Sequence, residues 1–268
     1  MEEQGLHEGT IRESLRTKWL GRNLHCYDMV SSTNETAMEC GRRKEPEGTL
    51  VIADAQRQGK GSHARTWLSE ADSNIYSSVL LYPVMSEKEM VGMSLATALA
   101  IVRVLQTYVS GRVSIKLPNE ILLNGKKVCG ILAETQKQKD CTLAVIGFGM
   151  NVNQQAMPEE LKVKASSLYI EEKRTFDRER LLAAILFQLE SIYEDYAREH
   201  SLLGYETEIN QVLIHKDKEV LLCYGSKKRK VRTLGIEKDG SLIAQAPDKG
   251  ICHVYAGEIS LRGIEGYI

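Results

Sequence analysis

The sequence lacks any long, uninterrupted hydrophobic segment. Its most apolar stretch, residues 90–105, is broken by Gly92, Ser94, Thr97 and Arg103. Because a helix that crosses a bilayer needs about 20 predominantly apolar residues, we expect no transmembrane segment. The first residues, MEEQGLHEGTIRES, are polar and acidic, a pattern typical of neither a secretory leader nor a transit peptide. We therefore expect a cytoplasmic protein without a membrane partner.

Paired cysteines and clustered histidines are also missing. The six cysteines lie at positions 26, 40, 129, 141, 223 and 252 without any C-x-x-C spacing, and the six histidines are dispersed. This pattern favours separate thiols in a reducing compartment over a disulfide framework or a structural zinc site. No protein ligands for a metal can be assigned from the sequence.

The chain has almost no net charge. Its 35 Lys and Arg residues and 36 Asp and Glu residues give a formal charge of −1. Such a balance argues against a general surface for nucleic acids or membranes. One basic run, Lys227–Lys230, lies near a predicted turn, and we interpret it as a solvated surface rather than a nucleic-acid contact.

What the sequence does contain is a regular succession of strand and helix patterns. Strands are predicted at 24–30, 49–53, 74–82, 112–116, 121–123, 127–134 and 141–151, and helices at 9–20, from within 31–36, 86–109 and 176–199. Asn124-Gly125 predicts a tight hairpin turn. Short strand patterns separated by turn residues follow residue 211 and predict a small β-barrel or sandwich. We expect two domains, 1–211 and 212–268.

Four short segments have polar or glycine-rich patterns that suit chemistry. They are Ser32-Thr33-Asn34, Gly59-Lys-Gly-Ser-His-Ala-Arg-Thr-Trp67, Lys116-Leu-Pro-Asn-Glu120 and Gly147-Phe-Gly-Met-Asn151. Each alone has an ordinary explanation as a helix cap, a turn, a surface lysine or a bulge. However, a glycine-rich loop also lets backbone N–H groups approach a phosphate, and the cationic side chains of this loop add positive charge there.

In this order the segments resemble those of the biotin protein ligases, which attach biotin to a lysine of carboxylase carrier domains. In that family Ser-Thr-Asn opens a helix, a Gly-Arg-Gly-Arg-Arg-Gly-Arg-x-Trp loop follows a strand, and Lys-Trp-Pro-Asn-Asp precedes a hairpin. The resemblance extends to Gly130-Ile-Leu-Ala-Glu134 and Gly257-Glu-Ile-Ser-Leu-Arg262. It implies an α+β fold with a mixed sheet and helices, similar to class II synthetases, plus a small C-terminal SH3-like β-barrel.

The resemblance also implies an activity and a site. The enzyme would use ATP and Mg²⁺ to form biotinyl-5′-AMP and then transfer biotin to a carrier lysine. Lys116 would be the catalytic charge that contacts the biotin carboxylate and the α-phosphate. The residues implied for biotin are Ser32, Thr33, Asn34, Gln56, Gly59, Lys60, Gly130, Ile131, Leu132, Gly147 and Gly149. Those implied for ATP and the adenylate are Lys60, Gly61, Ser62, His63, Arg65, Trp67, Lys116, Asn119 and Asn151.

The glycine-rich loop is expected to become ordered over the adenylate and to exclude water, since a mixed anhydride is prone to hydrolysis. Trp67 either packs beside the ligand or belongs to the ordinary core. The hydroxyls of Ser32 and Thr33 either bind the ureido ring of biotin together with Gln56 or cap the following helix.

Four changes separate this sequence from the family pattern. Lys60 replaces an arginine, Ser62 and His63 stand where two further arginines are usual, Leu117 replaces a tryptophan, and Glu120 replaces an aspartate. Guanidinium groups bind phosphates through two parallel hydrogen bonds, so their loss predicts an adenylate that is held less tightly and leaks into solution. Leu117 leaves a smaller wall near the ligand.

Two other functions remain open at this point. A lipoate or octanoate transferase of the same superfamily would need a cysteine nucleophile, but Cys129 lies in an apolar strand pattern without an adjacent base. The arginine-poor loop would also suit a non-catalytic biotin or adenylate sensor, against which the presence of Lys116 and Asn119 argues. About twenty residues precede the matching core, so we expect no winged DNA-binding domain and no DNA partner. The resemblance allows a homodimer through sheet edges.

Overall fold

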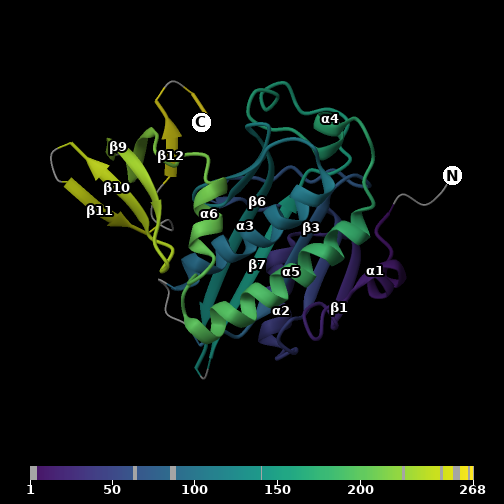
Figure 1. The fold of residues 1–268 in the computed structure, drawn as a ribbon. Coiled ribbons are helices and arrows are strands. Elements are labelled where there is room, and N and C mark those ends of the chain that lie inside the picture. The colour runs from purple at the N-terminus through teal and green to yellow at the C-terminus, as the bar shows by residue number, and fades with distance from the viewer. Residues whose placement is uncertain are drawn as a thin grey trace.

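The computed structural model describes residues 5–62, 65–84, 89–139, 141–224, 227–247, 250–255, 260–264 and 266–267. A seven-stranded sheet flanked by helices forms the larger part of the molecule, and a five-stranded sheet lies beside it (Figure 1). The short helix α6 (Glu206–Val212) lies between the two sheets and connects them along the chain (Figure 1).

The large sheet has the strand order β1-β2-β3-β7-β6-β5-β4. Its strands are β1 (Leu24–Val30), β2 (Leu50–Gln56), β3 (Ile75–Leu81), β4 (Val113–Lys116), β5 (Glu120–Leu123), β6 (Lys126–Lys137) and β7 (Thr142–Met150). Among its described strand pairs, β1 and β2 run parallel and the others antiparallel, so the prediction of a mixed sheet is confirmed. Asn124 and Gly125 have φ angles of 51° and 83°, as a two-residue hairpin turn between β5 and β6 requires.

Helices cover both faces of this sheet. On one face, α3 (Glu89–Tyr108) packs against α5 (Arg178–Glu199), and α1 (Glu8–Ser14) packs beside α5 (Figure 1). On the other face, α2 (Thr33–Arg42) lies over β2, β3 and β7. Successive residues of β2 alternate between these two cores: Leu50 and Ile52 contact the large cluster, and Val51 contacts the small cluster under α2.

Helix α3 has the length and apolar composition of a membrane span, but it is the central helix of the core. Most of its residues are buried against the sheet and α5. This burial explains why the sequence pattern is apolar almost all round the helix rather than along one stripe. The short helix α4 (Leu168–Glu172), like α6, has no counterpart among the predicted elements.

The first helix is shorter than predicted because a carboxylate of α5 binds the backbone that follows it. The pattern predicts a helix over 9–20, whereas α1 ends at Ser14. Glu190, which is buried, accepts hydrogen bonds from the backbone N–H groups of Lys18, Trp19 and Leu20 at 2.8, 2.8 and 2.9 Å. These three contacts hold residues 18–20 in a non-helical conformation.

Replacing Glu190 with glutamine should destabilise the protein markedly. The amide would keep one acceptor oxygen for Trp19 and Leu20, but its NH₂ group would face the N–H of Lys18. We expect the free energy of unfolding to fall by about 2–3 kcal/mol, since the partly buried Lys18 N–H loses its charged acceptor. Urea denaturation of the variant measures this, with Glu194→Gln on the partly exposed side of the same helix as the control. Equal stability of E190Q and E194Q would contradict the assignment.

The second sheet has the order β11-β10-β9-β8-β12 and is antiparallel throughout. Its strands are β8 (Glu219–Tyr224), β9 (Lys227–Ile236), β10 (Leu242–Ala246), β11 (Gly250–Val254) and β12 (Ser260–Gly263). This arrangement is consistent with the predicted SH3-like module. It differs from a closed barrel, however, because β11 and β12 each pair with a single strand within the described residues.

The predicted domain division after residue 211 falls in the last turn of α6. Buried residues of both sheets, such as Ile115 of β4 and Val220 of β8, belong to one continuous hydrophobic cluster. The division into 1–211 and 212–268 therefore stays a prediction. The basic run Lys227–Lys230 lies at the start of β9, where Lys230 pairs with Glu219 at 2.8 Å.

Candidate active site

Three glycines form a bare platform on the face of the large sheet that also carries the N-terminus of α2. Gly130 of β6 pairs directly with Gly149 of β7, and Gly147 lies two residues further along β7. A Cβ atom at Gly149 would lie 2.6 Å from the indole of Trp67, and one at Gly147 would lie 1.8 Å from Asn34 Oδ1. The β6–β7 register is unbroken, so these glycines do not mark a bulge. They allow side chains to lie flat on the sheet.

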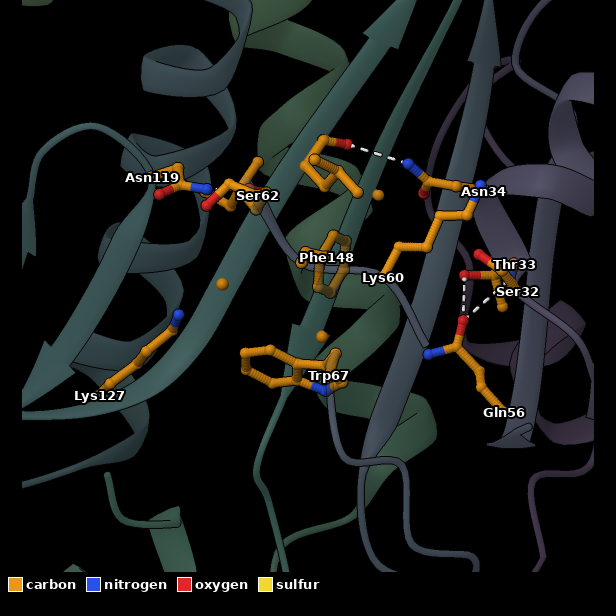
Figure 2. Close-up of a pocket in the computed structure, with 16 residues that line it drawn as sticks. Ser32, Thr33, Asn34, Gln56, Lys60, Ser62, Trp67, Asn119, Lys127 and Phe148 are labelled. Carbon is orange, nitrogen blue, oxygen red and sulfur yellow. Dashed lines mark hydrogen bonds between the residues drawn. The ribbon is translucent and has the colours of Figure 1, made fainter. Parts of the chain in front are cut away.

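The beginning of α2 presents polar groups to one side of this platform (Figure 2). Gln56 Oε1, at the end of β2, accepts hydrogen bonds from Thr33 N–H at 2.9 Å and from Thr33 Oγ1 at 3.2 Å. Gln56 thereby caps the helix, and Ser32 at the N-cap position makes no side-chain capping bond. Asn34 Nδ2 donates to Glu134 Oε2 at 2.7 Å, which fixes the amide between α2 and β6.

The glycine-rich loop forms a narrow hairpin over the platform. Lys60 and Thr66 form an isolated β-bridge, Trp67 N–H donates to the Gly59 carbonyl at 2.8 Å, and a Cβ at Gly59 would lie 2.5 Å from the Trp67 carbonyl oxygen. Lys60 Nζ pairs with Glu35 Oε1 at 2.6 Å, and this hydrogen bond raises the pKa of Lys60. The charge of Lys60 is therefore compensated from α2. His63, one of the predicted phosphate contacts, lies outside the described residues.

A carboxylate held by two lysines lies on the opposite side of the platform. Glu120 Oε1 is 2.8 Å from Lys127 Nζ, and Glu120 Oε2 is 2.7 Å from Lys116 Nζ. Burial alone would raise the pKa of Glu120, but the charges of Lys127 and Lys116 lower it to about 2. Burial lowers the pKa of Lys116, against the opposing effect of Glu120. The carboxylate of Glu120 is thus ionised at neutral pH.

Two cavities meet at this cluster. The narrow one has a volume of about 40 Å³ and the wide one about 220 Å³. Gly61, Ser62, Trp67 and Lys127 line both. The narrow cavity is small because the indole of Trp67 lies across Gly130 and Gly149, with Lys127 Nζ 5.1 Å from the ring centroid (Figure 2).

Most of the predicted site residues lie around these cavities. The narrow cavity is lined by Ser32, Thr33, Asn34, Gln56, Lys60, Gly61, Ser62, Trp67, Asn119, Gly130, Ile131, Leu132, Gly147 and Gly149. The wide cavity is lined by Gly61, Ser62, Arg65, Trp67 and Asn151 among the predicted residues, and Gly59 borders a separate hollow under the loop. Lys116 borders neither cavity, and only 8% of its side chain is exposed.

Lys127 is the functional candidate that the sequence analysis missed. It borders both cavities, whereas Lys116 lies behind Glu120. Glu120, at the edge of the wide cavity, was noted in the sequence only as a departure from a motif. One sequence feature could have indicated Lys127: it lies just after the Asn124-Gly125 turn and shortly before Gly130.

One group of potential metal ligands lies away from the cavities. Ligand atoms of His25, Cys40 and Glu45 lie within 4.8 Å of one another. The guanidinium of Arg43 donates to Cys40 Sγ at 3.3 Å and to Glu45 at 3.0 Å, so a cation is already present. Burial and the neighbouring Glu45 raise the pKa of the Cys40 thiol to about 11, which disfavours the thiolate that a metal would need.

Comparisons with known proteins show the family to which the chain belongs. Residues 27–151 match the Biotin/lipoate A/B protein ligase family. The chain is 35% identical to the bifunctional ligase/repressor BirA of Bacillus spizizenii, over 96% of this chain and 79% of that protein. The chain belongs to the biotin protein ligases. It is 31% identical to the biotin--[acetyl-CoA-carboxylase] ligase of Mycobacterium tuberculosis, over 69% of this chain and 70% of that enzyme.

A solved biotin protein ligase has the same fold. The enzyme from Aquifex aeolicus, in complex with biotin and ATP, superposes with a TM-score of 0.79 at 29% identity, over 90% of this chain and 99% of that one. The resemblance read from the four motifs is thus confirmed, and the protein is an enzyme of the ligase class. Cys129 is fully buried in the main core, and burial raises its pKa to about 12, so the structure offers no cysteine nucleophile there.

Replacing Gly149 of the glycine platform with alanine should reduce the affinity of this biotin protein ligase for biotin. The new Cβ would lie 2.6 Å from the Trp67 indole and would lift any flat ligand group from β7. We expect biotin to bind about tenfold more weakly, or about 1.4 kcal/mol, as measured by calorimetry. Gly9→Ala serves as the control, because a Cβ there meets nothing within 4 Å. Unchanged affinity of G149A would contradict the platform assignment.

Proposed function

We propose that the narrow cavity of this ligase binds biotin, that the wide cavity binds ATP, and that Lys127 brings the two together. One observation carries the proposal: Lys127 of β6 borders both cavities, and Figure 2 shows its side chain among the residues that line the narrow one. A carboxylate and a triphosphate repel each other, so their reaction needs a cation where the two anions meet. Lys127 stands at that position.

The narrow cavity suits the two ends of biotin. Ser32, Thr33 and Gln56 form its polar end and can exchange hydrogen bonds with the N–H and C=O groups of the ureido ring. The sheet glycines, together with Phe148 and Trp67, offer apolar surface to the remainder of the ligand. Its free volume is smaller than biotin needs, so we expect Trp67 and the glycine-rich loop to move when biotin enters.

The wide cavity suits a nucleotide. Trp67, Met157 and Leu161 provide apolar surface for a base, and Arg65 and Lys127 provide positive charge for the phosphates. Asn151 Nδ2 donates to the Ser166 carbonyl at 3.0 Å and so fixes the segment that carries Lys164 and Ala165 along this cavity. Asn151 therefore shapes the adenine side of the site through this segment.

The ligase reaction then proceeds in two displacements. A carboxylate oxygen of biotin attacks the α-phosphorus of ATP, the bond to the β-phosphate oxygen breaks, and pyrophosphate leaves. Lys127 stabilises the charge that gathers on the α-phosphate, and Lys116 holds Glu120 in place behind it. In the second step a carrier lysine amine attacks the acyl carbon, loses a proton, and AMP leaves.

Mg²⁺ would reach the site together with the nucleotide. Among the described residues that line the wide cavity, Glu120 is the sole carboxylate, and it already accepts contacts from Lys116 and Lys127. The protein therefore fits poorly as a direct Mg²⁺ ligand set. Phosphate oxygens and water are the ligands that this ion commonly keeps in nucleotide sites.

The test is to mix the protein with biotin, ATP, Mg²⁺ and a biotin carboxyl carrier domain and to follow the mass of the carrier. We expect the mass of one biotin to be added, and the addition to disappear without ATP. Biotin binding in calorimetry without any transfer would support a sensor instead. Transfer of octanoate or lipoate in place of biotin would support the sister transferases.

A further inference from the structure

Tyr267 reaches the proposed adenylation site from outside the large sheet. It follows β12 (Ser260–Gly263), the edge strand of the second sheet. Its hydroxyl donates to Glu120 Oε2 at 2.7 Å, and its ring centroid lies 3.8 Å from Lys116 Nζ. None of the sequence motifs includes Tyr267, and the proposed function assigns it no role.

The hydroxyl of Tyr267 completes the environment of the Glu120 carboxylate. Among the described residues, Oε2 accepts hydrogen bonds from Tyr267 and Lys116, whereas Oε1 accepts one from Lys127. Two donors on one oxygen fix the rotation of the carboxylate, so the other oxygen stays directed at Lys127. The position of the Lys127 ammonium group therefore depends, through Glu120, on a hydroxyl supplied by the segment after β12.

The ring of Tyr267 forms a wall of the wide cavity. It lines that cavity together with the apolar groups of Trp67, Met157 and Leu161. The ring also covers Lys116, whose side chain is only 8% exposed. A cation over an aromatic face is stabilised by the ring, so removing the ring would expose Lys116 to the cavity and to water.

We propose that Tyr267 is a positioning residue for adenylation, whose hydroxyl orients Glu120 and Lys127 and whose ring forms part of the nucleotide cavity. The inference rests on the proposed function, in which the wide cavity binds ATP. It makes Tyr267 part of the nucleotide half of the site. Tyr267 is not among the described residues that line the narrow cavity, which is the proposed biotin half of the site.

Two variants separate the two parts of this role. Tyr267→Leu removes the ring and the hydroxyl, and we expect the KM for ATP in pyrophosphate exchange to rise about tenfold. Tyr267→Phe keeps the ring, and we expect a near-normal KM for ATP with a kcat reduced about threefold, because Glu120 loses its neutral donor. The Kd of biotin, measured by calorimetry, should stay within about twofold of the wild type in both variants. A purely structural role would not produce this division between KM, kcat and Kd.

The matched control is Tyr255→Phe, which removes a similar hydroxyl–carboxylate hydrogen bond, to Asp239 at 3.0 Å, from the end of β11. We expect it to leave ATP and biotin kinetics unchanged. A KM for ATP that stays the same or falls in Y267L would overturn the inference. A rise in the Kd of biotin as large as the rise in the KM for ATP would overturn it too. Wild-type protein without biotin-dependent exchange would overturn the proposed function and, with it, the inference. Active wild type with a normal Y267L variant would overturn the inference alone.

Discussion

Replacing Lys127 with methionine should reduce biotin-dependent exchange of pyrophosphate into ATP by about 10²–10³-fold, the cost of removing one preorganised charge from a transition state. The thioether keeps most of the length of the side chain, so packing against Trp67 changes little. The ammonium group, which is 5.1 Å from the Trp67 ring centroid and between the two cavities, is lost. Exchange assays at saturating biotin and ATP measure the effect on kcat.

Two other lysines make this result specific. Lys126→Met is the matched control, because this neighbouring side chain is 42% exposed and lies near Glu171 at 3.9 Å. We expect normal exchange in that variant. Lys116→Met should cost only about tenfold, because Lys116 is assigned to hold Glu120 rather than to contact substrate. If the loss in K116M equals that in K127M, Lys116 contacts the reacting groups directly, as the motif alone predicts.

The sequence predicts the strands of the large sheet well because they are alternating, β-branched or strongly apolar runs and end at recognisable turns. The four motifs also meet in space, since the N-terminus of α2, the end of β2 and the glycines of β6 and β7 face one side of the sheet. These are local features. Each depends on residues close together in the chain or on strands that are neighbours in the sheet.

The role of Lys127 could not be predicted from alternation because a bulge intervenes. Glu120 pairs with Gly130 and Ile121 with Cys129, but Leu122 pairs with Lys127, so Val128 is an extra residue in β6. Regular alternation from Gly130 would turn Lys127 towards the main core. The bulge turns Val128 into that core instead and leaves Lys127 on the site face.

Long-range contacts account for the remaining differences. Tyr267 meets Glu120 across 147 positions of the chain, and Glu190 meets Leu20 across 170. No periodicity or motif records such a pairing, because it depends on how the second sheet and α5 dock. The same holds for α1, whose early end at Ser14 is set by a carboxylate from α5.

Replacing Ser62 with arginine should slow the escape of the adenylate by about 10–100-fold, because a charge-assisted hydrogen bond to phosphate contributes about 1.5–3 kcal/mol. Ser62 borders both cavities, so a guanidinium there could reach a phosphate. In the described part of the loop, Lys60 is already paired with Glu35 at 2.6 Å, which leaves Arg65 as the loop cation that borders the wide cavity. The wild-type loop therefore holds the phosphate side with little charge of its own.

The release rate is measured by forming labelled biotinyl-AMP in a single turnover and following its appearance in solution, with biotinylation of a free amine as a second readout. Ser62→Gln is the control, because it adds a long polar side chain without charge. Slow release in S62R but not in S62Q assigns the leak to the missing guanidinium. Equal release in both variants and the wild type would mean that other contacts, such as closure of the loop by Trp67, determine how long the adenylate stays. In that case the substitution of arginine by serine would have no effect on retention, and the low charge of the loop would need another explanation.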